Sequence, residues 1–206
     1  MDGHCPTARS YSRDLAACPR TRLPCRFRIV GSGGRSAVLL TADHAGRSIP
    51  RSLAKLQLSD EVLETHGAWD LGVAALAERL SARLDAVLIL HNYSRLVIDV
   101  NHPPWAPDSI VVRSENALIP SNRTLSSDVR RRGPEALFEP CHRRIAAELD
   151  GRSRQGQPGV LVAVHSFTPV HGGQRRIPHV ELEVRQDLIA TTKGQQACWP
   201  LPSAAG

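Results

Sequence analysis

Short apolar runs, each followed by polar or charged residues, alternate along this chain with segments that have the pattern of amphipathic helices. The runs have the length of buried strands, and they cover residues 37–41, 87–90, 96–100, 159–164 and 179–184. We expect helices to begin near Ser59 and Asp70, and a third helix to cover about residues 134–151. Strands that alternate with helices predict an α/β fold with a mixed, largely parallel sheet flanked by helices.

Length and composition predict one globular domain. The chain has 206 residues, of which 41% are hydrophobic and 22% are charged. No apolar run approaches the roughly 18 residues that a membrane-spanning helix needs, so we expect a soluble protein with no membrane partner. The domain is expected to span residues 37–190, between an unstructured Arg- and Pro-rich extension at 1–36 and an irregular tail at 191–206.

Most of the positive charge lies in the predicted extension. Residues 1–36 contain seven arginines and two aspartates, a net charge of +5 that leaves +1 of the chain's +6 for the rest. Because aromatic residues make up only 4% of the chain and no basic stripe accompanies them, we expect no nucleic-acid partner. The odd number of cysteines, and the lack of an apolar signal-peptide core after Met1, favour a cytoplasmic location.

The polar residues that end the apolar runs are the candidates for chemistry, because open α/β sheets bind ligands beyond the carboxyl ends of their strands. These residues are Asp43, His44, Asp99, Asn101, His165 and, in the last run, Glu181, Glu183 and Arg185. Imidazole and carboxylate groups suit zinc, and a catalytic zinc site uses three protein ligands. The sequence therefore predicts a hydrolytic metal site. The ordinary alternatives stay open: single histidines in loops, glutamates on a solvated edge strand, and Asp70 as a helix cap.

Ordered motifs between residues 37 and 190 resemble those of the N-formylglutamate amidohydrolases. They are LLTADHAG at 39–46, Trp69-Asp70, SRLVIDVN at 94–101, PCH at 140–142, VAVHSFTP at 162–169 and PHVELEVRQDL at 178–188. That family resembles the zinc carboxypeptidases in fold. The resemblance implies a metal-dependent hydrolase of N-acyl amides, for which N-formyl-L-glutamate is the name-giving substrate.

The resemblance also implies roles for individual residues. His44, Asp70 and His165 would bind zinc or another divalent metal, and Glu183 would be the general base that deprotonates the attacking water. The substrate would be a small anionic N-acyl amino acid. Arg95 and Asn101 would hold its carboxylate, and His142 and Arg185 complete the expected substrate-binding residues.

Three features depart from the family's pattern. His102 stands where relatives usually have Arg, Cys141 replaces a tyrosine, and residues 171–178 join two motifs that a longer segment separates in relatives. We therefore expect a shortened chain that lacks part of the sheet, with exposed edges that favour a homo-oligomer. Two alternatives to an active enzyme stay open. The chain could be a truncated, catalytically inactive member that binds weakly, or an interaction module that uses its basic extension.

Overall fold

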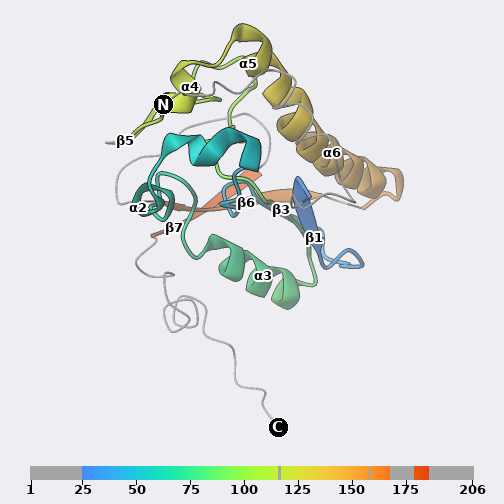
Figure 1. The fold of residues 1–206 in the computed structure, drawn as a ribbon. Helices are drawn as coiled ribbons and strands as arrows, with labels where there is room; N and C mark the ends of the chain where they lie inside the picture. The colour runs from blue at the N-terminus through green and yellow to red at the C-terminus, as the bar shows by residue number, and fades with distance from the viewer. Residues whose placement is uncertain (1–24, 116, 158, 168–178, 186–206) are drawn as a thin grey trace.

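The computed structural model describes residues 25–115, 117–157, 159–167 and 179–185 (Figure 1). Its main sheet has five strands in the order β1-β3-β2-β6-β7. The bounds are β1 Phe27–Val30, β2 Val38–Ala42, β3 Val87–His91, β6 Val160–Phe167 and β7 His179–Arg185. Strands β2, β3, β6 and β7 are parallel, and only β1 runs antiparallel to its neighbour β3. The predicted mixed, largely parallel sheet is confirmed.

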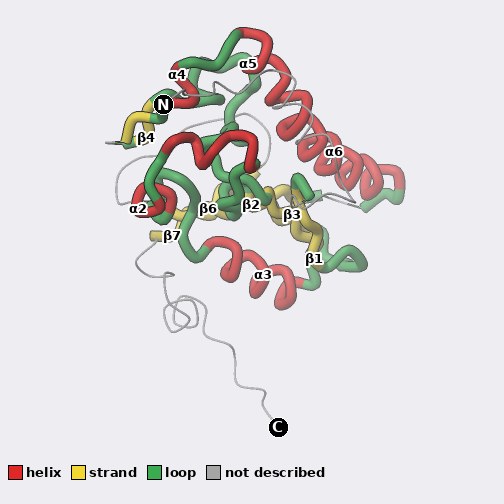
Figure 2. The backbone as a smooth tube through the Cα atoms, in the orientation of Figure 1, coloured by secondary structure: helices red, strands yellow, loops and turns green. Residues whose placement is uncertain are grey.

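Two helices cover the two faces of this sheet: α3 (Val73–Leu84) and α6 (Glu139–Arg154) lie on opposite sides of it (Figure 2). The strand residues alternate between the two faces, as the two-residue period of a strand requires. On one face Leu40, Leu88 and Leu90 pack against α3. On the other face Leu39, Val87 and Ile89 pack against Cys141 and Ile145 of α6. The apolar runs are therefore buried on both sides, which explains why they are continuous in sequence.

A second hydrophobic core lies beside the sheet and is built from the short elements. These are η1 (Arg51–Gln57), α2 (Asp60–Leu63), β4 (Arg113–Ser114), β5 (Ala117–Leu118), α4 (Pro120–Arg123), α5 (Ser127–Gly133) and η2 (Pro134–Phe138). Leu53 and Leu56 of η1, Val129 of α5 and Leu137 of η2 pack there around the buried segment 96–100.

Three sequence predictions need correction. The run 96–100 forms no strand but an irregular buried segment. Strand β1 lies inside the predicted unstructured extension 1–36, as an edge of the sheet. Helix α3 begins at Val73 with Gly72 as its N-cap, so Asp70 lies outside the helix and is not its cap. The helix expected at about 134–151 is confirmed: η2 and then α6 cover the residues from Pro134 to Arg154. The predicted tail at 191–206 lies outside the described residues.

Two observations concern the surroundings of the protein. None of the helices in the described part of the chain has the length and apolar character of a membrane-spanning segment. Cys25 takes part in a disulfide bond, whereas Cys141 is a buried free thiol. Because disulfides are typical of oxidising compartments, the cytoplasmic location inferred from the cysteine count stays a prediction.

The residues 54–57 adopt left-handed backbone angles, with φ of 44° at Ala54 and 59° at Gln57. This conformation costs an L-residue roughly 1–2 kcal/mol, and glycine avoids the cost. Ala54 is exposed, so we expect Ala54→Gly to raise the free energy of unfolding by up to about 1 kcal/mol in urea titrations. The matched control is Ala82→Gly at an exposed position of α3, which should lower it by about 1 kcal/mol. An equal decrease in the free energy of unfolding in the two variants would contradict the prediction.

Candidate metal centre

Three segments far apart in sequence bring His44, Asp70 and His165 together. His44 follows strand β2, His165 belongs to the parallel neighbour β6, and Asp70 lies in the turn before α3. Two hydrogen bonds, each donated by a backbone N–H, fix the turn against the ends of both strands. The Asp70 N–H donates to the His44 carbonyl oxygen at 2.9 Å, and the Ser166 N–H donates to Asp70 Oδ2 at 3.0 Å. The carboxyl ends of adjacent parallel strands thus hold the group at one edge of the sheet.

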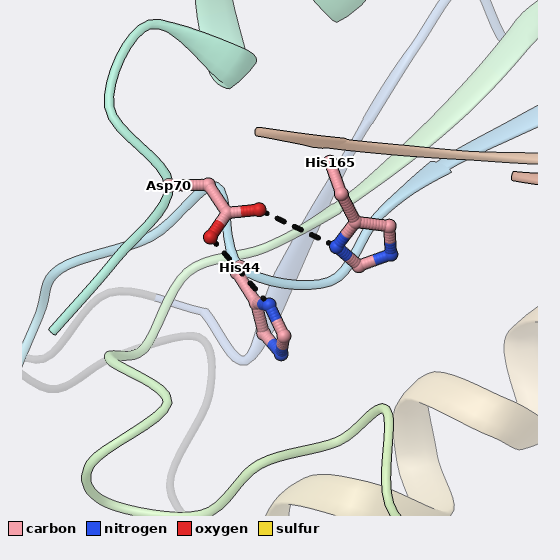
Figure 3. Close-up of side chains that lie close together, drawn as sticks. All are labelled: His44, Asp70 and His165. Carbon is pink, nitrogen blue, oxygen red and sulfur yellow. Dashed lines mark ion pairs between the residues drawn. The ribbon is translucent and has the colours of Figure 1, made fainter. Parts of the chain in front are cut away.

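Both histidines turn the same ring nitrogen toward Asp70 (Figure 3). His44 Nδ1 lies 3.6 Å from Asp70 Oδ1, and His165 Nδ1 lies 3.3 Å from Asp70 Oδ2. One donor atom from each of the three residues falls within 4.8 Å of the other two. The two imidazole rings meet edge to face, with 5.0 Å between their centroids. The carboxylate therefore stands between two convergent nitrogen atoms.

The group is buried, and its charges depend on one another. The exposed fractions are 3% for His44, 2% for Asp70 and 5% for His165. Burial alone lowers the pKa of His44, but the carboxylates of Asp99 and Asp70 outweigh it and raise that pKa to about 9. Burial likewise raises the pKa of Asp70, but hydrogen bonds with His165 and His44 hold it well below its usual range. Buried charges persist in proteins when they are paired or bind a metal.

Further charged groups surround the three residues. His44 Nε2 lies 2.7 Å from Asp99 Oδ1, and Asp99 Oδ2 accepts a hydrogen bond from Arg95 at 3.1 Å. Arg95 also lies 3.7 Å from Asp70 Oδ1, and Asp43 Oδ2 lies 4.0 Å from His165 Nε2. The sequence placed Asp99 among the candidates but gave it no role. No spacing links it to His44, which is 55 positions earlier, so only the fold reveals the contact.

The donor set fits a divalent transition metal. Two imidazole nitrogens and one carboxylate oxygen match the three protein ligands of catalytic zinc sites, which leave a position for water. A cation between these atoms would compensate the buried Asp70 carboxylate. It would also compete with a proton for His44, because a metal-ligating imidazole nitrogen must be deprotonated.

Of the remaining predicted site residues, some have described side chains and others do not. Arg95, with a side chain one-third exposed, approaches both Asp70 and Asp99. Asn101 is exposed, and its backbone N–H donates to Asp99 Oδ1. His142 of α6 donates from Nε2 to the Val100 carbonyl oxygen at 2.9 Å, so it supports the segment that carries Asn101. Glu183 is paired with His165 in the β6–β7 register, but its side chain and that of Arg185 are not among those described.

Comparison with known proteins identifies the chain's relatives. The family model of the N-formylglutamate amidohydrolases matches residues 36–171. The chain belongs to this family. A crystal structure of a gene product from Agrobacterium tumefaciens is similar with a TM-score of 0.79 and 29% identity, over 84% of this chain and 88% of that one. No match is found among curated proteins.

A second solved structure shares the amidohydrolase fold. It is an N-formylglutamate amidohydrolase from Ralstonia eutropha, with a TM-score of 0.56 and 21% identity over 70% of this chain and 58% of that one. The family membership confirms the prediction of an amidohydrolase enzyme. The Agrobacterium protein is about as long as this chain, since the matched shares are nearly equal, whereas the Ralstonia enzyme is longer. The prediction of a shortened chain depends on residues 171–178, which lie outside the described residues, so it stays a prediction.

Proposed function

We propose that this amidohydrolase removes the N-acyl group, typically N-formyl, from a small anionic amino acid such as N-formyl-L-glutamate, and that it depends on a divalent metal, most simply zinc. The observation that carries the proposal is the convergence of His44, Asp70 and His165 within 4.8 Å of one another in a member of this family. Zinc bound there would lower the pKa of a bound water to about 7, which makes hydroxide available at neutral pH.

Glu183 is the proposed general base. It would accept a proton from the attacking water and deliver that proton to the amine nitrogen as the amide C–N bond breaks. The products are then formate and glutamate. The register of β6 and β7 supports this role, because it places Glu183 next to His165 on the adjacent strand.

Arg95 and Asn101 are the proposed contacts of the substrate carboxylate. The Arg95 side chain is one-third exposed, and Asp99 Oδ2 accepts a hydrogen bond from one of its nitrogens. Its remaining donors suit the planar, bidentate recognition of a carboxylate. His142 and Arg185 keep their proposed substrate-binding roles as predictions. His102, at the position where relatives usually have Arg, pairs with Asp108 at 3.0 Å and supplies no fixed charge.

The test is formate release from N-formyl-L-glutamate by the zinc-loaded protein. We expect turnover that a chelator abolishes and added zinc restores, and much weaker turnover of N-formyl-L-alaninamide, which lacks a carboxylate. Full activity after complete metal removal would contradict the metal-dependent mechanism. A folded, zinc-loaded protein that hydrolyses no N-acyl amino acid would instead favour the inactive binding module.

A further inference from the structure

A groove separate from the candidate metal centre is lined by residues of the loop 103–110 and of the segment 130–139, where α5 leads through η2 into α6 (Figure 1). Its volume is about 600 Å³, and Trp105 lines it with 85% of its surface exposed. The other exposed large hydrophobic residues of the described chain reach at most 43%. The groove therefore presents an aromatic surface that the described part of the chain leaves uncovered.

Both walls of this groove are held in place by hydrogen bonds. Within the loop, the Ser109 N–H and Oγ donate to the carbonyl oxygens of Ala106 and Pro104, each at 3.1 Å. From the other wall, Arg130 Nη1 donates to the Ile110 carbonyl oxygen at 3.2 Å, which joins α5 to the loop. A groove that is already formed binds a ligand without the entropic cost of ordering its own walls.

The charge available in the groove is negative. Glu135 and Glu139 line it and are exposed, and Glu135 forms no ion pair within the described part of the chain. The two arginines of the groove are already engaged, because Arg130 donates to backbone carbonyl oxygens and Arg131 pairs with Asp128. A carboxylate near an exposed indole suits an arginine side chain, which can pair with the carboxylate and stack on the ring.

The described part of the chain begins beside this groove. Arg26 Nε donates to the carbonyl oxygen of Ala136 in η2 at 2.5 Å, one residue from Glu135. The six residues before Cys25 are PRTRLP at 19–24, with two prolines, two arginines and a leucine. In the extended polyproline II conformation, at about 3.1 Å per residue, they span about 19 Å. That length is enough to cross a groove of this size.

We propose that residues 19–24 bind in this groove of the same molecule, with Arg20 or Arg22 between Glu135 and the indole of Trp105. Proline-rich segments bind to aromatic-lined grooves because the polyproline II conformation loses little entropy on binding. The segment is tethered a few residues away, so its effective concentration is in the millimolar range, which favours it over a second copy of the chain or another protein. The inference is independent of the proposed function.

The experiment measures the contact of Trp105 with water in the full chain. The protein is labelled with fluorotryptophan, and the Trp105 fluorine NMR signal is the one missing from Trp105→Phe. Its shift between H₂O and D₂O reports solvent contact. Arg20→Gln with Arg22→Gln should make this shift about twofold larger, because the cation–π and ion-pair contacts are lost. The matched control, Arg9→Gln with Arg13→Gln, removes the same charge from the extension outside residues 19–24 and should leave the signal unchanged.

A substitution in the groove tests the same contact from the other side. Glu135→Gln keeps every arginine and should also increase the solvent shift of Trp105. An unchanged signal in Glu135→Gln, an equal shift in the wild type and the Arg20→Gln, Arg22→Gln variant, or the same effect in the control variant would overturn the proposal.

Light scattering together with the Trp105 signal, at low and high protein concentration, identifies the occupant. Protection of Trp105 from water at the mass of a monomer and at every concentration supports the tethered segment. Protection that appears only when a dimer forms would assign the groove to a second copy of the chain and refute the intramolecular contact.

Discussion

Replacing His44 and His165 together with alanine is expected to abolish stoichiometric metal binding. The double variant keeps only Asp70 of the three convergent donors. Structural zinc sites in zinc-finger peptides supply about 10–16 kcal/mol of binding free energy, which shows how much a set of protein ligands contributes. Loss of even about 4 kcal/mol weakens binding roughly 1,000-fold. Elemental analysis of protein purified without chelator should therefore find about one zinc per wild-type chain and almost none in the variant.

The control for this experiment is His66→Ala. His66 pairs with Glu115 outside the candidate metal centre, so its loss should leave the metal content at the wild-type level. Because the double alanine variant leaves Asp70 buried without its imidazole partners, its folding must be checked by circular dichroism. His44→Gln with His165→Gln keeps more of the side-chain volume and serves as the second variant. A folded double variant that retains one zinc per chain would contradict the assignment of these ligands.

The sequence predicted the central strands correctly because their burial on both faces is visible in the pattern of apolar residues. Strands β2, β3 and β6 are covered on both faces by α3 and α6, so each is a continuous apolar run. The edge strand β1 has no comparable apolar pattern. It is the sequence Phe27-Arg28-Ile29-Val30 with two exposed residues, directly after other arginines, and nothing in its composition separates it from the basic extension.

The segment 96–100 shows why an apolar run alone does not define a strand. It is buried in the second core, not in the sheet. Its backbone forms hydrogen bonds with side chains and not with a neighbouring strand. Ser94 Oγ accepts from the Leu96 N–H, and Asn122 Nδ2 donates to the Leu96 carbonyl oxygen. The spacing of apolar residues in the sequence does not reveal whether a backbone is paired with distant side chains or with a neighbouring strand.

The candidate site was predictable where it depends on strand ends and unpredictable where it depends on side-chain pairing. His44 and His165 follow from the rule that ligands gather at the carboxyl ends of parallel strands. Asp70 could equally have been a helix cap. The structure decides against the cap, because Gly72 occupies that position and the Asp70 carboxylate accepts from the Ser166 N–H.

Glu183→Gln is expected to lower kcat for N-formyl-L-glutamate by about 10²–10⁴-fold, the usual contribution of a general base, while the zinc content stays within about twofold of wild type. Glutamine has nearly the same shape as glutamate, but its amide cannot accept the proton of the attacking water. The proposed ligands are His44, Asp70 and His165, and the proposal gives Glu183 no ligand role, so its replacement should spare the metal. Steady-state formate release and elemental analysis of the same protein preparation measure the two quantities.

The matched control is Glu181→Gln on the same strand β7. In the register with β6, Glu181 is paired with Ala163, whereas Glu183 is paired with His165. The two substitutions remove the same charge from neighbouring positions of one strand, so they separate a catalytic effect from a change in net charge or strand stability. We expect Glu181→Gln to keep kcat within about threefold of wild type. Equal losses in both variants, or a Glu183→Gln protein that keeps full turnover, would refute Glu183 as the base. Loss of zinc in Glu183→Gln would make it a ligand instead.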